Sequence, residues 1–384
     1  MSKFKMTASL SAGLYAHIPF CLSKCRYCDF NSHPVEKYSG LVDAYLDALL
    51  EEIALRCSGH KIKTVFLGGG TPTILSERYL EKLIKGIYKN ADVSGAAEFS
   101  SEANPGTLTD TKLKLLYELG VNRLSLGLQS SSDAVLKTLG RAHSFSDFLA
   151  SYASARKAGF KNINIDLIFG VPGQNLEKLK KDLREVIELK PEHVSVYNLI
   201  LEAETPMFID VKKGLLKLPG DDADAAMYYY IKDYLEKYGF VHYEISNFAI
   251  TGKECKHNEI YWKNEDYIGV GAGASSKYAG KRSDNTESIE QYIVLIKKNK
   301  NAIIQSQKMG QMEEIKETVF LGLRMLEGLC LTTFKQRFGK DFFILFGKEF
   351  EKLSKLGLLK EEKGFVRLTK KGLFLSNEVF VEFV

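Results

Sequence analysis

Apolar residues follow two alternating patterns between Leu14 and about Ile200. Short runs of β-branched and other apolar residues, typical of buried strands, are separated by longer amphipathic or looser segments. The clearest amphipathic segment lies between Val42 and Ile53, where apolar residues recur at helical spacing. Six such strand and helix units in series predict a parallel sheet with helices outside it, as an open barrel or a doubly wound sheet. The six predicted strands are Leu14–Ile18, Thr64–Leu67, Ala97–Glu102, Arg123–Gly127, Ile163–Ile168 and His193–Leu199.

The pattern changes in the second half of the chain. A long helix is predicted over Asp222–Lys237, and a glycine-rich run follows at Gly269–Ser276. From Met312 onward, lysine-rich helical segments precede a short basic hairpin over Leu359–Leu368 that turns at Lys363-Gly364. Three helices followed by a hairpin are typical of a winged helix. We therefore expect three parts: an α/β domain over residues 1–205, a mixed extension over 206–310 and a winged-helix-like C-terminal domain over 311–384.

Composition excludes some classes of protein. The chain has 384 residues, of which 45% are apolar, and its 53 basic and 48 acidic side chains leave a net charge of +5. This small excess is spread along the chain and does not indicate a nucleic-acid partner. The longest uncharged run, Met6–Ser23, contains Pro19 and several hydroxyl side chains, so it resembles neither a membrane span nor a signal peptide. We expect a cytoplasmic protein with no transmembrane segment, for which peripheral membrane contact stays possible.

Three of the six cysteines lie close together, directly after the first predicted strand. Cys21, Cys25 and Cys28 are separated by three and two residues, whereas the other three are scattered. This is no disulfide framework for a chain of this length, so the group indicates metal or redox chemistry in a reducing compartment. Three thiolates on one loop suit a four-iron cluster with one iron left for a non-protein ligand. A zinc ion completed by His17 or His33 is the alternative.

Polar and glycine residues gather where the later strands end. The second strand runs into Gly68–Pro72, the third into Glu102–Gly106 and the fourth into Gly127–Ser130. The fifth carries Asp166 and ends in Gly170–Gly173. Glycine allows a ligand to approach the backbone closely, and ligands bind at the carboxyl ends of parallel strands. The sequence therefore predicts one ligand site at this edge, beside the cysteine loop.

Together these motifs resemble the radical S-adenosylmethionine (SAM) superfamily, over nearly the whole chain. Within it, the sequence resembles the group that contains the oxygen-independent coproporphyrinogen III dehydrogenases and the similar haem chaperones. The resemblance implies an α/β fold, a partial (β/α)6 barrel, followed by a helical, winged-helix-like C-terminal domain. The residues that carry it are Tyr15–Cys21, Cys28–Phe30, Gly68–Pro72, Glu102, Gln129, Arg141 and Asp166.

The resemblance also implies how the cofactors bind. Cys21, Cys25 and Cys28 would hold a [4Fe–4S] cluster, whose fourth iron is chelated by the amino and carboxylate groups of SAM. A side chain placed at Gly70 is then expected to block SAM without disturbing the fold. The residues that would contact the methionine amino group through backbone and hydroxyl oxygen are Gly69, Gly70 and Thr71.

Other family positions would contact the rest of SAM. Glu102 or Asp166 suits the ribose diol, because a carboxylate accepts two hydroxyl protons. Arg141 would pair with the SAM carboxylate or form an ion pair at the barrel rim. Tyr27 would pack on the adenine or shield the cluster. The full set implied for SAM outside the glycine segment is Tyr15, Tyr27, Glu102, Gln129, Arg141 and Asp166.

Two departures separate the functions within this group. The decarboxylating enzymes usually carry a fourth cysteine two positions after the triad, where this chain has Phe30. They also usually carry a longer segment before the cluster, whereas twenty residues precede Cys21 here. Both features match the haem chaperones, and they predict that this protein does not decarboxylate coproporphyrinogen.

A third feature is the motif His257-Asn-Glu-Ile-Tyr261-Trp262, which matches a pattern of the haem chaperones. A neutral imidazole is a natural axial ligand for haem iron, and flanking aromatic rings would cover the macrocycle. His257 is therefore the candidate haem ligand, and a histidine bonded within a loop is the alternative interpretation. Cys255 and His242 are the next candidates.

The leading hypothesis is a haem chaperone that binds haem and transfers it to acceptor haem proteins, such as respiratory cytochromes. It would use the [4Fe–4S] cluster and SAM for regulation or transfer. The first alternative is an oxygen-independent coproporphyrinogen III oxidase, in which a SAM-derived radical drives decarboxylation of propionates. The second is another radical SAM enzyme, such as a methyltransferase. Whether the protein is an enzyme stays open.

Overall fold

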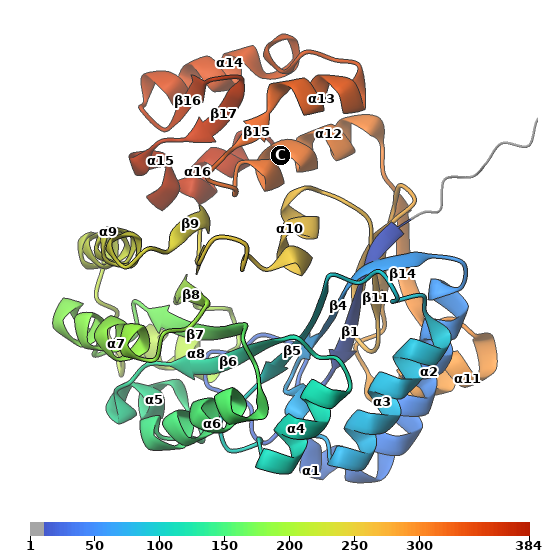
Figure 1. Cartoon of the computed structure of the whole chain (residues 1–384). Coiled ribbons are helices and arrows are strands. Elements are labelled where there is room, and N and C mark those ends of the chain that lie inside the picture. The colour runs from blue at the N-terminus through green and yellow to red at the C-terminus, as the bar shows by residue number, and fades with distance from the viewer. Residues whose placement is uncertain (1–10) are drawn as a thin grey trace, which may run out of the picture.

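The computed structural model describes residues 11–384 and centres on an open sheet of twelve strands (Figure 1). The first residues of the run Met6–Ser23 lie outside the described part. Six neighbouring parallel strands form the middle of the sheet, which confirms the predicted strands and α/β class. In order they are β1 (Ser11–Ile18), β4 (Lys61–Gly69), β5 (Glu98–Ala103), β6 (Arg123–Gln129), β7 (Ile163–Phe169) and β8 (His193–Asn198).

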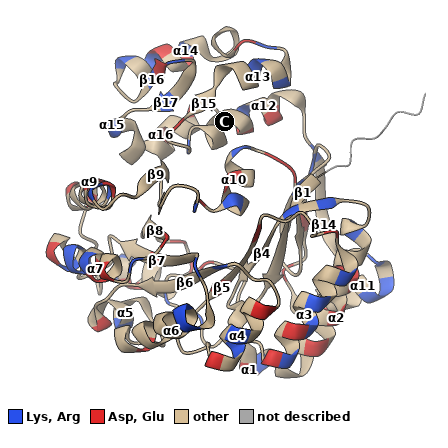
Figure 2. Ribbon diagram, viewed as in Figure 1, with Lys and Arg blue, Asp and Glu red and all other residues tan. Residues whose placement is uncertain are grey.

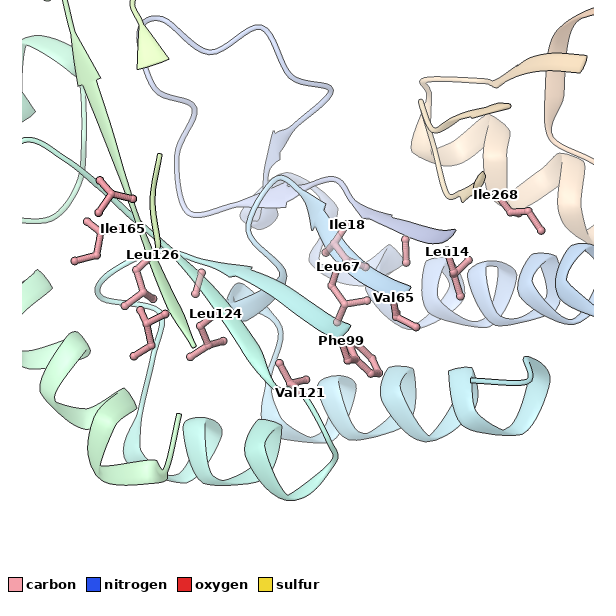
Figure 3. Packing of buried hydrophobic residues seen from close by; sticks show 14 of the residues in the cluster. Leu14, Ile18, Val65, Leu67, Phe99, Val121, Leu124, Leu126, Ile165 and Ile268 are labelled. Atoms are coloured by element: carbon pink, nitrogen blue, oxygen red, sulfur yellow. The ribbon is translucent and has the colours of Figure 1, made fainter. Parts of the chain in front are cut away.

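Helices cover the outer face of these strands. Leu14, Val65, Phe99 and Leu124 point from the strands toward this helical layer (Figure 3), and each is at most 4% exposed. Charges of both signs lie on the outer surfaces of α2, α3 and α4 (Figure 2), as expected for amphipathic helices facing water. The helices are α2 (Val42–Cys57), α3 (Glu77–Asn90), α4 (Asp110–Glu118), α5 (Asp133–Leu139), α6 (Phe145–Ala158) and α7 (Leu176–Glu188).

The opposite, inner face of the same strands is polar. Side chains alternate across a strand, so the residues between the outward apolar positions point inward. One cavity is lined from both β1 and β8, which shows that the sheet curves into a partial barrel around this face. The inward residues are buried although most are polar, and they include Thr64, Glu98, Ser100, Arg123, Ser125, Asn164, His193 and Ser195.

Residues 206–310 extend the sheet at both of its edges. β9 (Val241–Glu244) and β10 (Asn247–Ala249) join antiparallel beside β8. At the other edge, β11 (Tyr267–Val270) pairs in parallel with β1, so the glycine-rich run belongs to a strand and its turn. The remaining elements are β12 (Ser275–Tyr278), β13 (Lys281–Asn285), β14 (Ile303–Lys308), α8 (Pro206–Lys212), α9 (Asp221–Lys237), which matches the predicted helix, and α11 (Ile289–Asn299).

A short helix, α10 (Lys256–Trp262), links the two edges across the amino ends of the central strands (Figure 1). The carboxylate of Glu98, at the start of β5, accepts hydrogen bonds from the N–H groups of Lys256 at 2.9 Å and His257 at 3.2 Å. Gly13 of β1 leaves room for the helix, since a Cβ there would lie 3.0 Å from Ile260 Cδ1. The helix therefore forms the floor of the barrel.

The C-terminal part contains helices and a three-stranded sheet, in the arrangement predicted as a winged helix. The predicted hairpin is present and turns at Lys363 and Gly364, both with positive φ, as a two-residue hairpin turn requires. The elements are α12 (Gln311–Gly322), β15 (Leu329–Cys330), α13 (Leu331–Phe338), α14 (Phe342–Lys355), β16 (Leu359–Glu362), β17 (Phe365–Leu368), α15 (Lys370–Phe374) and α16 (Ser376–Val381).

Candidate functional site

The loop with the three cysteines is tied at both ends. β2 (Phe20–Cys21) pairs in parallel with β3 (His33–Pro34), and together they close the loop at the carboxyl end of β1. Within the loop, the Arg26 N–H donates to the Leu139 carbonyl at 3.0 Å, and the Arg26 carbonyl accepts from the Met207 N–H at 2.9 Å. The loop is thereby held against the end of α5 and the start of α8.

All three cysteines line one cavity of about 330 Å³ at the carboxyl ends of the strands, the cluster cavity. Each sulfur has at least one polar neighbour. Cys21 Sγ lies 3.5 Å from the Thr71 hydroxyl, and Cys25 Sγ accepts from Arg141 Nη1 at 3.5 Å. Cys28 Sγ lies 4.0 Å from the Ser32 hydroxyl. These donors suit thiolates, so the donor set fits a cluster bound through three sulfurs.

The two histidines proposed to complete a zinc site, His17 and His33, already form hydrogen bonds within the protein. His17 is 5% exposed, and both of its ring nitrogens are engaged, Nδ1 with the Tyr15 hydroxyl at 3.0 Å and Nε2 with the Asn31 carbonyl at 2.8 Å. His33 Nε2 is bonded to Asn31 Oδ1 at 3.0 Å. Zinc ligation by any of these three nitrogens would break an existing hydrogen bond.

The glycine segment meets the cluster loop through its backbone. The Gly70 N–H donates to the Ile18 carbonyl at 2.8 Å and the Thr71 N–H to the Phe20 carbonyl at 2.7 Å. The Gly69 N–H donates to Glu102 Oε2 at 3.1 Å. All three N–H groups are therefore engaged within the protein. This segment would meet an amino group through its oxygen atoms, which accept hydrogen bonds.

The expectation that a side chain at Gly70 would only obstruct a ligand is wrong. A Cβ at this position would lie 2.6 Å from the Phe20 carbonyl oxygen and 2.9 Å from that of Ile18. Both are backbone atoms of the chain that enters the cluster loop, so they cannot move aside as a flexible side chain could. Gly70 is needed for the contact between two backbone segments.

Most of the other predicted SAM residues meet at the cluster cavity, and two do not line it. The hydroxyl of Thr71 lies beneath the cavity, between Cys21 and the Asn104 amide, which donates to it at 2.6 Å. Tyr15 lines two neighbouring cavities instead. The predicted residues that share the cavity with the cysteines are Tyr27, Gly69, Gly70, Glu102, Gln129, Arg141 and Asp166.

Two carboxyl groups project into this space from β5 and β7, the strands on either side of β6. Burial, and next the charge of Asp166, raise the pKa of Glu102 to about 8. Asp166 accepts hydrogen bonds from Ser125 at 3.1 Å and Asn164 at 2.8 Å, while burial raises its pKa above the usual value. Burial is the larger cause of the raised pKa of Glu102, and the second acid in the cavity adds to it because two like charges disfavour each other's ionisation.

Arg141 and Gln129 are held in unusual positions at the cavity. Arg141 donates to the Gly127 carbonyl at 2.8 Å and also bonds to Asn104, so part of its guanidinium is used within the protein. Gln129 is 8% exposed and has a φ of 71°, a left-handed conformation that side chains rarely adopt. Backbone strain of this kind is typical of functional sites.

His257 does not lie at the cavity mouth but on the barrel floor. It is 1% exposed and stacks on Phe66, with Nδ1 bonded to the Thr64 hydroxyl at 2.7 Å and Nε2 to the Tyr261 hydroxyl at 2.8 Å. Contrary to expectation, neither nitrogen is presented to a ligand. The two flanking rings do not form one surface either. Tyr261 faces the barrel, whereas the centroid of the Trp262 ring lies 4.3 Å from the Arg324 guanidinium carbon.

The two other candidate haem ligands are also buried. Cys255 is fully buried, and burial raises its pKa to about 12, so it is a protonated thiol at neutral pH. His242 is 5% exposed, stacks on Phe248 and is bonded to the Ile245 carbonyl at 3.1 Å.

Sequence reasoning missed the polar inner face that supports these carboxyl groups. Asn164 donates to both Ser125 and Asp166, and its Oδ1 is bonded to His193 Nδ1 at 2.6 Å. Central parallel strands usually read as continuous apolar runs. The polar residues at every second position, as in Arg123-Leu-Ser125, were the signal that could have shown a functional inner face.

Known proteins match both parts of the chain. Residues 15–186 match the radical SAM superfamily and residues 311–375 the HemN C-terminal domain. The solved structure of coproporphyrinogen III oxidase (HemN) from Escherichia coli, described as a radical SAM enzyme, superposes with a TM-score of 0.84 at 26% identity. The superposition covers 98% of this chain and 90% of the HemN chain.

Relatives with a higher sequence identity to this chain are named heme chaperone HemW. The heme chaperone HemW of Lactococcus lactis is 41% identical over 96% of both chains. That of Bacillus subtilis is 41% identical over 96% of this chain and 98% of its own. Full-length similarity at this level, with the cysteine triad and both domains present, decides the relationship. The chain belongs to the HemW family of haem chaperones within the radical SAM superfamily.

Proposed function

We propose that this protein is a cytoplasmic haem chaperone, which binds haem and delivers it to acceptor haem proteins such as respiratory cytochromes. The observation that carries the proposal is the 41% identity to HemW over nearly the full length of both chains, against 26% to HemN. No helix within residues 11–384 is both long and apolar enough to cross a membrane.

The cysteine loop would bind the [4Fe–4S] cluster, and SAM would occupy the rest of the cluster cavity. The bound cluster supplies an iron with an open coordination position. The protein's own part is to donate hydrogen bonds to the sulfurs from Thr71, Arg141 and Ser32 and to present the carboxyl groups of Glu102 and Asp166. Glu102 would accept hydrogen bonds from the ribose hydroxyls.

The rival function is coproporphyrinogen decarboxylation, and Phe30 is the residue that bears on it. Phe30 is 68% exposed and lines both the cluster cavity and a neighbouring cavity of about 390 Å³, whose lining includes Tyr15, Tyr261 and Tyr267. An aromatic ring therefore stands between the two cavities where the decarboxylating relatives usually have a cysteine.

One experiment separates the two functions. We expect the anaerobically reconstituted protein to bind haem, to transfer it to an apo-cytochrome and to form no decarboxylated product from coproporphyrinogen III. Absorbance titration and product chromatography measure these outcomes, with HemN of E. coli as the positive control for decarboxylation. Product formation above that of the Cys21→Ala variant would replace the chaperone proposal with the enzyme.

His257 gives a second prediction. His257→Ala should lower the free energy of unfolding by about 1–3 kcal/mol, because it leaves the buried Thr64 and Tyr261 hydroxyls without a partner. The Soret band of the haem-bound protein should stay unchanged. Denaturant unfolding and absorbance spectroscopy test this, with His60→Ala as the control for loss of a less buried histidine. A shifted Soret band in His257→Ala alone would restore His257 as the axial ligand.

A further inference from the structure

Arg123 is a buried cation that the proposed function does not use. It is the first residue of β6 and is 2% exposed, and its side chain is turned toward the inside of the barrel. Among the described residues its Nε has no hydrogen-bond partner. Burial disfavours the charge of Arg123, whereas the nearby groups Cys255, Glu98, Tyr243 and Asp166 favour it and hold its pKa above the ordinary value. The unpaired Nε is costly to bury, so it points to a role inside the barrel beyond these contacts.

The space that Arg123 faces is an inner cavity of about 210 Å³ between the barrel floor and the cluster cavity. Glu102 and Asp166 line both cavities. Arg123 therefore lies below the two carboxyl groups, on the side away from the cysteine loop. Its charge acts on both of them and lowers the pKa of each, against the larger effect of burial.

The other groups that face the two acids supply no positive charge from below. Tyr15 comes from β1, Tyr197 from β8 and His257 from the floor helix α10. Burial and the charge of Arg123 lower the pKa of His257 to about 3, so this imidazole is neutral. Above the acids, the Arg141 guanidinium is bonded to Asn104, Gly127 and Cys25.

We propose that Arg123 is a positioning residue for SAM, whose buried positive charge favours ionisation of the Glu102 and Asp166 carboxyl groups as acceptors for the ribose hydroxyls. This inference rests on the proposed placement of SAM. The physical reason is that an ionised carboxylate accepts hydrogen bonds at both oxygens, whereas a neutral carboxylic acid has one oxygen that carries a proton and donates it to a hydrogen bond. Two carboxylates in a poorly solvated cavity ionise together only when a cation is near.

The sign of the pH dependence follows from Glu102. Below a pH of about 8 its carboxyl group is largely protonated in the free protein, so SAM affinity should rise as the pH increases through this value. Removal of the Arg123 charge raises the pKa of both acids further. The pH midpoint for SAM binding then moves to higher pH.

Arg123→Gln and Arg123→Lys test the proposal in the reconstituted holoprotein. SAM affinity is measured against pH by equilibrium dialysis, and the infrared carbonyl band of protonated Glu102, assigned with Glu102→Gln, is titrated without SAM. We expect the midpoint of Arg123→Gln to rise by about one pH unit and its SAM affinity at pH 7 to fall about tenfold. Arg123→Lys, which keeps the charge, should restore most of both.

The readouts separate this inference from the placement of SAM. If the wild type binds no SAM, the placement fails, but the infrared titration still tests Arg123. Equal infrared midpoints in wild type and Arg123→Gln overturn the inference. If Arg123→Gln does not fold, Arg123→Lys decides: a midpoint near that of the wild type supports a role for the charge, and a large alkaline shift contradicts it.

Discussion

Replacement of Cys25 by alanine is expected to remove the [4Fe–4S] cluster and, with it, SAM binding. Cys25 is the middle member of the triad, and its sulfur accepts a hydrogen bond from Arg141 at 3.5 Å. Two remaining thiolates on the loop would leave two irons without protein ligands, and Phe30 offers no substitute. The loss should be close to complete, because the loop residues otherwise contact the cavity only through polar and aromatic side chains.

Iron and sulfide content after anaerobic reconstitution, together with electron paramagnetic resonance of the reduced protein, measure this loss. Cys330→Ala is the matched control, since Cys330 is also a free thiol but lies at the start of α13 in the C-terminal domain. A Cys25→Ala protein that keeps four irons would show that the ligand set is assigned to the wrong residues.

Gly70→Ala should abolish SAM binding and prevent stable reconstitution of the cluster. The added Cβ would lie 2.6 Å from the Phe20 carbonyl oxygen, so β4 and the start of the cluster loop must separate. The hydrogen bonds from Gly70 and Thr71 to the Ile18 and Phe20 carbonyls would be strained. Overpacking of this kind costs about 1–3 kcal/mol, and here the strain falls at the entrance of the loop with the cysteines.

Thermal unfolding, iron content and SAM dialysis of the same preparation test the prediction. Gly95→Ala is the control, because a Cβ at Gly95 meets no atom within 4 Å. Normal iron content together with lost SAM binding in Gly70→Ala would instead favour the simpler view that Gly70 only leaves space for the ligand.

The two ends of the barrel have different tasks in this arrangement. The carboxyl ends of the strands carry the cysteine loop and the cluster cavity. The amino ends are closed by α10, which holds His257 and Tyr261 of the family motif. Tyr261 also lines the tyrosine-rich cavity next to Phe30, so the motif can influence the ligand cavities through this residue. A family motif thus need not mark the residue that touches the ligand.

Local pattern was sufficient for the central strands, helices α2 and α9, the cysteine loop and the hairpin turn at Lys363 and Gly364. Each is specified by residues close together in the chain: the side-chain periodicity of a strand or helix, the spacing of three thiols, or two residues that tolerate positive φ. The family resemblance added the cofactors and most of the residues that meet at the cluster cavity.

Only the tertiary structure decided which distant residues meet. His257 is bonded to Thr64, 193 positions earlier in the chain, and this contact places it on the barrel floor. The same holds for Gly70 against Phe20 and for Arg123 below Glu102 and Asp166. Periodicity states which face of an element is buried but not what it is buried against, because that partner depends on how all twelve strands order themselves in the sheet.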